Sequence, residues 1–73
     1  MSHTVVAELV AAVMKVEVEV GQRVAAEDAV VILESMKMEI PVLSERAGTI
    51  GELHVVEGEV LQEGDLIATV VPA

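Results

Sequence analysis

Apolar and polar residues follow a period of two along parts of the chain, which predicts β-strands and not helices. Residues 16–20 alternate between valine and glutamate, the pattern of a half-buried strand, and valine is favoured in strands. Residues 30–33 and 66–71 form short apolar runs, as expected for strands buried in the core of a sandwich. A helix is conceivable only over residues 5–18, where valine would crowd the helical turns. We therefore expect strands throughout.

Glycines separate these runs and mark the predicted turns. Short strands broken this often are typical of an all-β sandwich or barrel. The five glycines, all expected in turns, are Gly21, Gly48, Gly51, Gly58 and Gly64.

The sequence also contains an internal repeat with an offset of 37 positions. With this offset Gly21 aligns with Gly58 and Asp28 aligns with Asp65, and apolar positions around them also align. Valine-rich strands match one another readily by chance, but paired Gly and Asp positions argue against that explanation. Two units of about 35 residues predict a pseudo-twofold structure. Because neither unit could bury its apolar face alone, we expect the two units to interlock.

Composition supports a folded chain and excludes several kinds of site. The 73 residues are 53% hydrophobic and include sixteen valines, enough to fill one small core. The chain has no cysteine, which excludes a disulfide framework, a thiolate metal site and a cysteine nucleophile. It also has no Phe, Tyr or Trp, so it lacks the stacking platforms of proteins that bind single-stranded nucleic acid.

The net charge of −9 has the wrong sign for binding nucleic acid or an anionic membrane surface. No apolar run approaches the roughly 18 residues of a membrane-spanning helix, and Glu8 interrupts the first apolar stretch where a secretory signal would lie. We expect a soluble, cytoplasmic protein that is a monomer in isolation. The acidic surface either steers the chain toward basic clefts on its partners or keeps a hydrophobic protein soluble.

One of the two lysines, Lys37, lies between two methionines at the centre of a predicted hairpin. Apolar runs flank this polar centre, and Pro41 suits an edge strand because it cannot donate a ladder hydrogen bond. An exposed turn gives a modifying enzyme access to the ε-amine. An exposed amine is protonated at neutral pH, which argues against a Schiff-base catalyst. The plainer interpretation is a solvated lysine between methionines that pack on the core.

The motif Glu34-Ser35-Met36-Lys37-Met38-Glu39 resembles the biotin-attachment motif of biotinyl domains, the carrier modules of biotin-dependent carboxylases. The similarity extends over about residues 5–71, and residues 47–50, 57–60 and 64–67 resemble later turns and strands of the family. It implies a single attachment domain over residues 1–73. It also implies a flattened barrel of two four-stranded antiparallel sheets with quasi-twofold symmetry. In that family the modified lysine lies at a hairpin tip, which corresponds to Lys37.

The resemblance implies a function as well as a fold. Lys37 would carry biotin in amide linkage, attached by a biotin protein ligase. The biotin arm would then move a carboxyl group between biotin carboxylase and carboxyltransferase sites, and the chain itself would hold no catalytic residue. The residues expected to be recognised by the ligase or by partners are Glu34, Ser35, Met36, Met38 and Glu39.

Two alternatives stay open on the sequence. Lipoyl domains share this fold, and the nearest alternative to a biotin carrier is a carrier of lipoate, or of either biotin or lipoate, on Lys37. The lysine of lipoyl domains, however, usually lies in an Asp-Lys-Ala context. An unmodified scaffold, with the two methionines as a docking patch, is the second alternative.

The chain departs from the family pattern in two places. Residues 9–13 replace a Pro-Met-Pro-Gly-like segment, and no glycine lies near Glu27 and Asp28. Both departures concern turn geometry and leave the lysine motif intact. His3, in a terminal segment expected to fray, and His54, expected on a strand surface, are too distant from each other to suggest a metal site.

Overall fold

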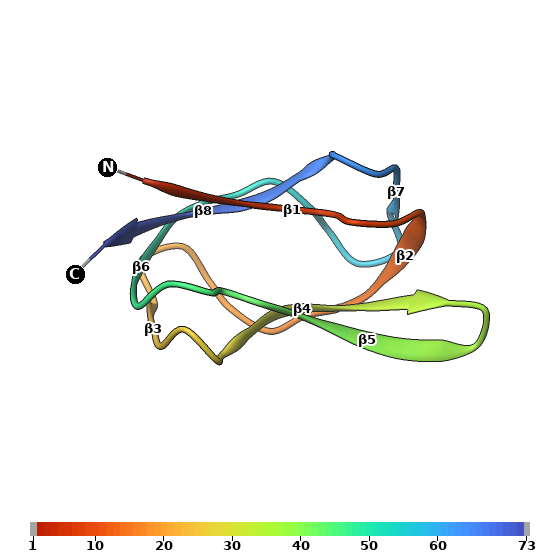
Figure 1. Ribbon diagram of the computed structural model, residues 1–73, viewed down its shortest axis with the longest axis horizontal. Helices are drawn as coiled ribbons and strands as arrows, with labels where there is room; N and C mark the ends of the chain where they lie inside the picture. Colours follow the sequence, from red (N-terminus) through yellow and green to blue (C-terminus); the bar gives the residue numbers. More distant parts are fainter. Residues whose placement is uncertain (1, 73) are drawn as a thin grey trace.

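The computed structural model describes residues 2–72, which form two antiparallel sheets packed face to face (Figure 1). One sheet has the strand order β1-β8-β6-β3 and the other has the order β5-β4-β2-β7. This arrangement confirms the predicted pair of four-stranded antiparallel sheets, and residues 2–72 contain no helix. The strands are β1 (His3–Val6), β2 (Ala11–Val16), β3 (Arg23–Val24), β4 (Ala29–Ser35), β5 (Met38–Leu43), β6 (Gly48–Leu53), β7 (Val60–Leu61) and β8 (Leu66–Pro72).

The core between the sheets consists of small and β-branched side chains. Both sheets contribute through their inward-facing residues, and the central strands β4 and β8 supply the most completely buried ones. Valine, isoleucine and leucine fill this layer without an aromatic residue because the two sheets lie close together and the branched side chains interdigitate. The buried apolar side chains are Val5, Ala7, Ala11, Val13, Val18, Val24, Val30, Val31, Leu33, Ile50, Val55, Leu61, Ile67, Ala68 and Val70.

The internal repeat of the sequence is a repeat of structure. Strands β2, β3 and β4, each moved forward by 37 positions, coincide in their bounds with β6, β7 and β8. Strand β1 corresponds to the second part of β5 in the same way. The offset therefore exchanges the two sheets, as the predicted pseudo-twofold symmetry requires.

Reciprocal backbone hydrogen bonds connect the two halves. The amide of Gly21 donates to the carbonyl of Ile50, and the amide of Gly58 donates to the carbonyl of Val13, each at 2.8 Å. These two bonds are related by the same offset of 37 positions. Each half therefore satisfies backbone groups of the other, which confirms that the halves interlock.

Two predictions about local structure were wrong. The strand expected at residues 16–20 lies earlier in the chain: β2 ends at Val16, although Val18 stays buried and the amide of Glu17 still donates to the carbonyl of Val30 at 2.9 Å. Gly48 and Gly51 lie inside β6 and not in turns. The other three glycines do occupy turns, with φ of 90–92°.

Both strand glycines have a packing role. An added Cβ at Gly48 would lie 2.1 Å from the backbone oxygen of Val71, so β6 and β8 could not keep their separation there. Gly51 lies where the β6–β8 register shifts, and the one short contact of its added Cβ would be with the Cγ2 of Val71 at 2.9 Å, since atoms of Thr69 stay at 3.5 Å or more. The clash at Gly51 is with a half-exposed side chain that can rotate away.

The two histidines also differ from expectation. His3 belongs to β1, and its Nε2 lies 3.2 Å from Oε1 of Glu45, so this segment is ordered by pairing with β8. His54 is a surface residue as expected, but it follows the end of β6, with Nε2 3.1 Å from Oε1 of Glu52.

We expect Gly48→Ala to lower the free energy of unfolding by about 2–4 kcal/mol, because a rigid backbone atom must move to admit the new methyl group. Gly51→Ala is the matched control, with an expected loss of about 1 kcal/mol or less because only a side chain must rotate. Urea denaturation followed by far-UV circular dichroism measures both values. Equal losses in the two variants would contradict the argument from the Val71 backbone.

Candidate functional site

Strands β4 and β5 form the predicted hairpin, with Met36 and Lys37 as its two turn residues. Ser35 pairs with Met38 at the end of the ladder. The neighbouring strand β2 pairs with β4 only as far as Glu34, so the turn extends beyond the sheet. Figure 1 shows this turn projecting from the end of the molecule opposite the two termini. The hairpin presents Lys37 away from the body of the protein.

The turn adopts a conformation that its residues disfavour. Met36 has a φ of 53° and Lys37 a φ of 65°, and positive φ at both central residues is the requirement of a type I′ turn. Asn-Gly is the preferred sequence for such a turn, because a side chain in the left-handed region costs about 1–2 kcal/mol per residue. Backbone strain of this kind concentrates at functional sites. The identities of these two residues are therefore not explained by the needs of the turn.

The side chains at the turn are also unusually exposed. Met36 is 91% exposed and Met38 is 63% exposed, so the interpretation in which these methionines pack on the core is wrong. Lys37 is exposed, and its amine has no ion-pair partner among residues 2–72. Exposed thioethers offer an adaptable apolar contact to another protein. The tip thus presents a primary amine between two exposed apolar side chains, and no residue of the described part of the chain forms an ion pair with the amine.

The two faces of the hairpin have different chemistry. Glu34 and Glu39 are directly opposite each other in the ladder, and both are exposed. Like charges in this position destabilise a hairpin by a few tenths of a kcal/mol, up to about 1 kcal/mol. Ser35 and Met38 are the next opposite pair, so they lie on the other face. One face is acidic and the other largely apolar.

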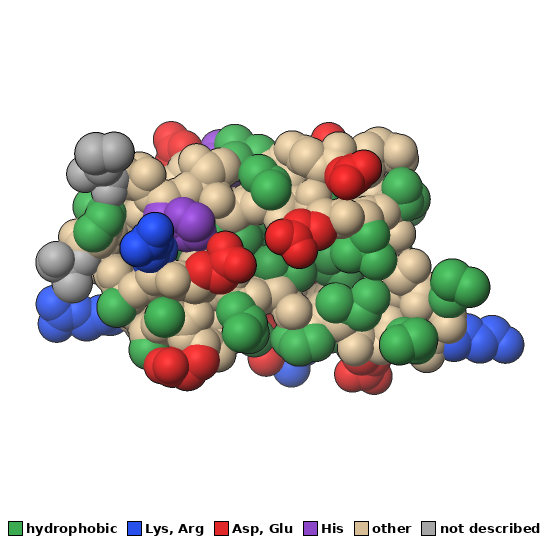
Figure 2. All heavy atoms as spheres, in the orientation of Figure 1, with side chains coloured by type: hydrophobic (Ala, Val, Ile, Leu, Met, Phe, Trp, Pro, Cys, Tyr) green, Lys and Arg blue, Asp and Glu red, His purple; other side chains and the backbone are tan. Residues whose placement is uncertain are grey.

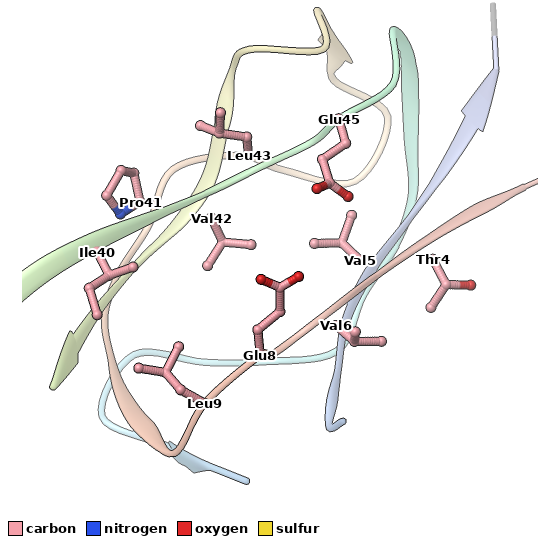
Figure 3. Close-up of a pocket in the computed structure, with 10 residues that line it drawn as sticks. All are labelled: Thr4, Val5, Val6, Glu8, Leu9, Ile40, Pro41, Val42, Leu43 and Glu45. Carbon is pink, nitrogen blue, oxygen red and sulfur yellow. The ribbon is translucent and has the colours of Figure 1, made fainter. Parts of the chain in front are cut away.

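A groove lies between the edge strands β1 and β5, at the seam where the two sheets do not pair (Figure 3). Its volume is about 220 Å³. Apolar residues form most of its walls: Val5, Val6 and Leu9 on one side and Ile40, Val42 and Leu43 on the other. Sequence reasoning missed this groove. The repeat contained a signal for it, because Val5 and Val42 are 37 positions apart and occupy equivalent places in the two sheets.

Two carboxylates also line the groove. Glu8 follows β1 and Glu45 follows β5, again 37 positions apart. Figure 3 shows both carboxylates directed toward the space between Val5 and Val42. Glu45 is held next to His3, whereas Glu8 has no hydrogen-bond or ion-pair partner among residues 2–72. The groove is therefore apolar with one uncommitted acceptor.

The part of the chain that the structure describes contains no group of three or more His, Asp or Glu side chains that could hold a metal ion. Residues 2–72 also include no helix with the length and apolar character to cross a membrane. Figure 2 shows acidic side chains scattered over the visible face, with one Lys or Arg side chain isolated at the hairpin end.

The chemistry of the tip fits covalent attachment of an acyl group. Amide formation needs an accessible primary amine, and Lys37 supplies one on a turn held by the ladder of β4 and β5. The second lysine, Lys15, lies in β2, with its Nζ 3.5 Å from Oε1 of Glu17. Of the two lysines, Lys37 is the one at the projecting turn, with no ion-pair partner among the described residues.

Known proteins resemble this chain over nearly its whole length. A family model described as "Biotin-requiring enzyme" matches residues 2–70. The "Biotinylated protein TB7.3 homolog" of Mycobacterium leprae is 49% identical over 70 residues, which cover 96% of this chain and 99% of the relative. The "Biotin/lipoyl attachment protein" of Bacillus subtilis is 39% identical over 64 residues, which cover 88% of each chain. Part of the Kluyveromyces lactis urea carboxylase structure superposes with a TM-score of 0.91 at 30% identity, covering 97% of this chain and 6% of the carboxylase.

If the turn residues are not chosen for stability, replacing them with the preferred pair stabilises the protein. We expect Met36→Asn combined with Lys37→Gly to raise the free energy of unfolding by about 1 kcal/mol, since both positive φ values become favourable. Lys37→Arg, which keeps a long cationic side chain, should leave stability within about 0.5 kcal/mol of the parent. Urea denaturation tests both. A double variant less stable than the parent would show that the native turn residues stabilise the hairpin.

Proposed function

The chain belongs to the biotin/lipoyl family of biotin-requiring enzymes, and from this membership we propose that it carries biotin on the ε-amine of Lys37. The single observation that carries the residue assignment is the exposed Lys37 at a strained turn between two exposed methionines. The Met-Lys-Met sequence supports biotin as the group. The chain is a carrier and not itself a catalyst, because the chemistry of the family belongs to the attached group and to the enzymes that act on it.

Attachment depends on an enzyme that acts on the hairpin. An exposed lysine amine is a weak nucleophile at neutral pH without a neighbouring base, and the Lys37 amine has no side-chain hydrogen-bond or ion-pair partner among residues 2–72. A biotin protein ligase supplies the activated carboxyl group of biotin and the base, and Lys37 supplies the nitrogen. The amide forms between Nζ and the biotin carboxyl carbon, with loss of the activating group and of an amine proton.

Each flanking residue has a proposed part in this recognition. Met36 and Met38 give the ligase an apolar contact on both sides of the amine, which their exposure leaves available. Glu34 and Glu39 form the acidic face of the hairpin and favour a basic surface on the ligase or on later partners. Ser35 lies opposite Met38 at the base of the turn, where it contributes to recognition by the ligase or by partners.

The loaded arm serves two partner enzymes in turn. When bound, biotin supplies a ureido nitrogen that accepts a carboxyl group at a biotin carboxylase site and gives it up at a carboxyltransferase site. The lysine side chain and the valeryl chain span roughly 13 Å from the backbone, counted from standard bond lengths. A tether of this kind raises the local concentration of the group at either site. The resemblance to part of a urea carboxylase supports carboxylase partners.

We place the protein in the cytoplasm as a monomer. The absence of cysteine fits a reducing compartment. The net charge of −9 opposes self-association and favours fast encounter with basic clefts, at rates that fall as salt rises.

Lipoate is the second candidate group, favoured by one observation. The Bacillus subtilis relative is named for attachment of biotin or lipoate. The Met-Lys-Met sequence of this chain favours biotin over lipoate, so lipoate ranks behind it.

Intact mass spectrometry after co-expression with a biotin protein ligase and excess biotin tests the function. We expect a single increase equal to one biotin less one water, present in the Lys15→Arg variant and absent in the Lys37→Arg variant. The two variants match because they remove the only two lysines of the chain, one at a time.

An increase with a lipoate ligase and not with the biotin ligase would assign the chain to lipoate. No increase with either ligase would overturn the carrier proposal, and an unmodified scaffold would then explain the exposed methionines. An increase that persists in Lys37→Arg would contradict the assignment of the residue.

A further inference from the structure

The groove between β1 and β5 begins close to the attachment site. Strand β5 follows Lys37 directly, and alternate residues of a strand share one face. Met38, Ile40 and Val42 therefore lie on the same face of β5, and the last two line the groove. Ile40 and Val42 are half-buried, whereas Met38 is exposed. An apolar path leads from the turn into the groove.

The arm has the length to follow this path. A strand rises about 3.3 Å per residue, so Ile40 lies about 10 Å and Val42 about 16–17 Å from Lys37 along β5. A biotin ring at the end of its tether lies roughly 13 Å from the Lys37 backbone. The ring of an arm laid back along β5 therefore falls between these two groove residues.

The lining of the groove is also chemically complementary to the biotin ring. The fused bicycle of biotin has an apolar thioether side and a urea with two N–H donors and one acceptor. The walls made by Leu9, Ile40 and Val42 suit the apolar side. The Glu8 carboxylate points into the groove and has no partner among the described residues, so it is free to accept from a urea N–H. A hydrogen bond to an ionised acceptor is among the stronger ones available.

We propose that this groove is a resting site for the biotin ring carried on Lys37 of the same chain, with Glu8 as the hydrogen-bond acceptor of the urea. This inference rests on the proposed function. The volume of about 220 Å³ supports it, because that is less than a drug-sized ligand needs and suits a small ring system. The side chains between the sheets are almost fully buried, so this layer is not open to a ring that arrives from the surface.

Weak affinity is sufficient for such docking. A short flexible tether gives an effective concentration in the millimolar range. A groove that binds the free ring with a dissociation constant of about 1 mM would therefore hold a tethered ring for about half of the time. The arm stays available to partners, because an equilibrium of this size is reversed by a partner site that binds more tightly.

The two carboxylates give the groove a preference for the uncharged ring. Glu8 and Glu45 both face the space between Val5 and Val42. A biotin ring that has accepted a carboxyl group is negatively charged, and these two carboxylates repel it. The resting site thus holds the arm in its uncharged form and releases it when it becomes anionic. No residue of the hairpin turn itself is needed for this selection.

Methyl and amide NMR spectra of the intact 73-residue chain, unmodified and biotinylated, test the proposal. Mass spectrometry first establishes that Lys37 is fully biotinylated. We then expect resonance shifts at the methyl groups of Leu9, Ile40 and Val42, and nuclear Overhauser contacts between these methyls and the biotin ring protons.

The matched variants are Glu8→Ala and Glu27→Ala. Both remove an exposed carboxylate, but Glu27 lies in the turn before β4, at the end of that strand opposite the hairpin. Glu8→Ala should lower the docking equilibrium about tenfold, through loss of a charge-assisted hydrogen bond, and return the groove resonances toward their unmodified positions. Glu27→Ala should leave them unchanged, and the amide spectrum of each variant reports that it is folded.

The outcomes separate this inference from the function on which it rests. If the protein is fully biotinylated but resonances shift only at residues 35–38, the resting site is wrong and the carrier function stands. Groove shifts that persist unchanged in Glu8→Ala overturn the role of Glu8 as acceptor. If Lys37 is not biotinylated at all, the proposed function itself has failed.

Discussion

The mutual burial of the two halves is the interaction on which the rest of the structure depends. Each half supplies strands to both sheets, and the buried valines of both halves belong to one core cluster. The amides of Gly21 and Gly58 each donate to a backbone carbonyl of the other half, so each half also provides hydrogen-bond partners for the backbone of the other. A two-stranded hairpin alone is marginally stable in water. The projecting turn of β4 and β5 is held in place because β4 is a central strand whose Val30, Val31 and Leu33 are fully buried in this core.

The stability of the buried core allows the β4–β5 turn to have a locally unfavourable conformation and composition. Met36 and Lys37 adopt positive φ, Glu34 lies opposite Glu39, and two methionines are exposed to water. The positive φ values and the opposed glutamates cost stability locally, and the exposed methionines contribute none through burial. Together these features place an amine, an acidic face and an apolar face within a few residues. For a carrier this arrangement is useful, since the enzymes that attach and use the group must recognise a surface that the fold holds still. The cost at the tip is offset by burial elsewhere in the sandwich.

The pseudo-twofold symmetry is broken at the two ends of the molecule. The offset of 37 positions places the chain termini where the hairpin lies in the other half, so one end of the molecule has a turn and the other has two chain ends (Figure 1). Within residues 2–72, the turn with an exposed lysine between two methionines therefore lies at one end of the molecule only. The seam between β1 and β5 keeps the symmetry, with Val5 and Glu8 on one side and their counterparts Val42 and Glu45 on the other. A symmetric groove next to one projecting turn is a direct consequence of building the sandwich from a duplicated unit.

The sequence by itself determined the all-β class, the repeat, the hairpin and the lysine at its tip. These features are encoded locally, by the alternation of apolar residues, by glycines at positive φ and by a contiguous motif around Lys37. Only the tertiary structure decided that Gly48 and Gly51 belong to a strand, because the reason is the close approach of Val71 in β8. It alone placed His3 in a paired strand and brought Glu8 and Glu45 to one groove. The repeat relates Glu8 to Glu45, but only the packing of β1 beside β5 brings the two to one groove. These outcomes depend on which distant segments pack together, which no local pattern of residues specifies.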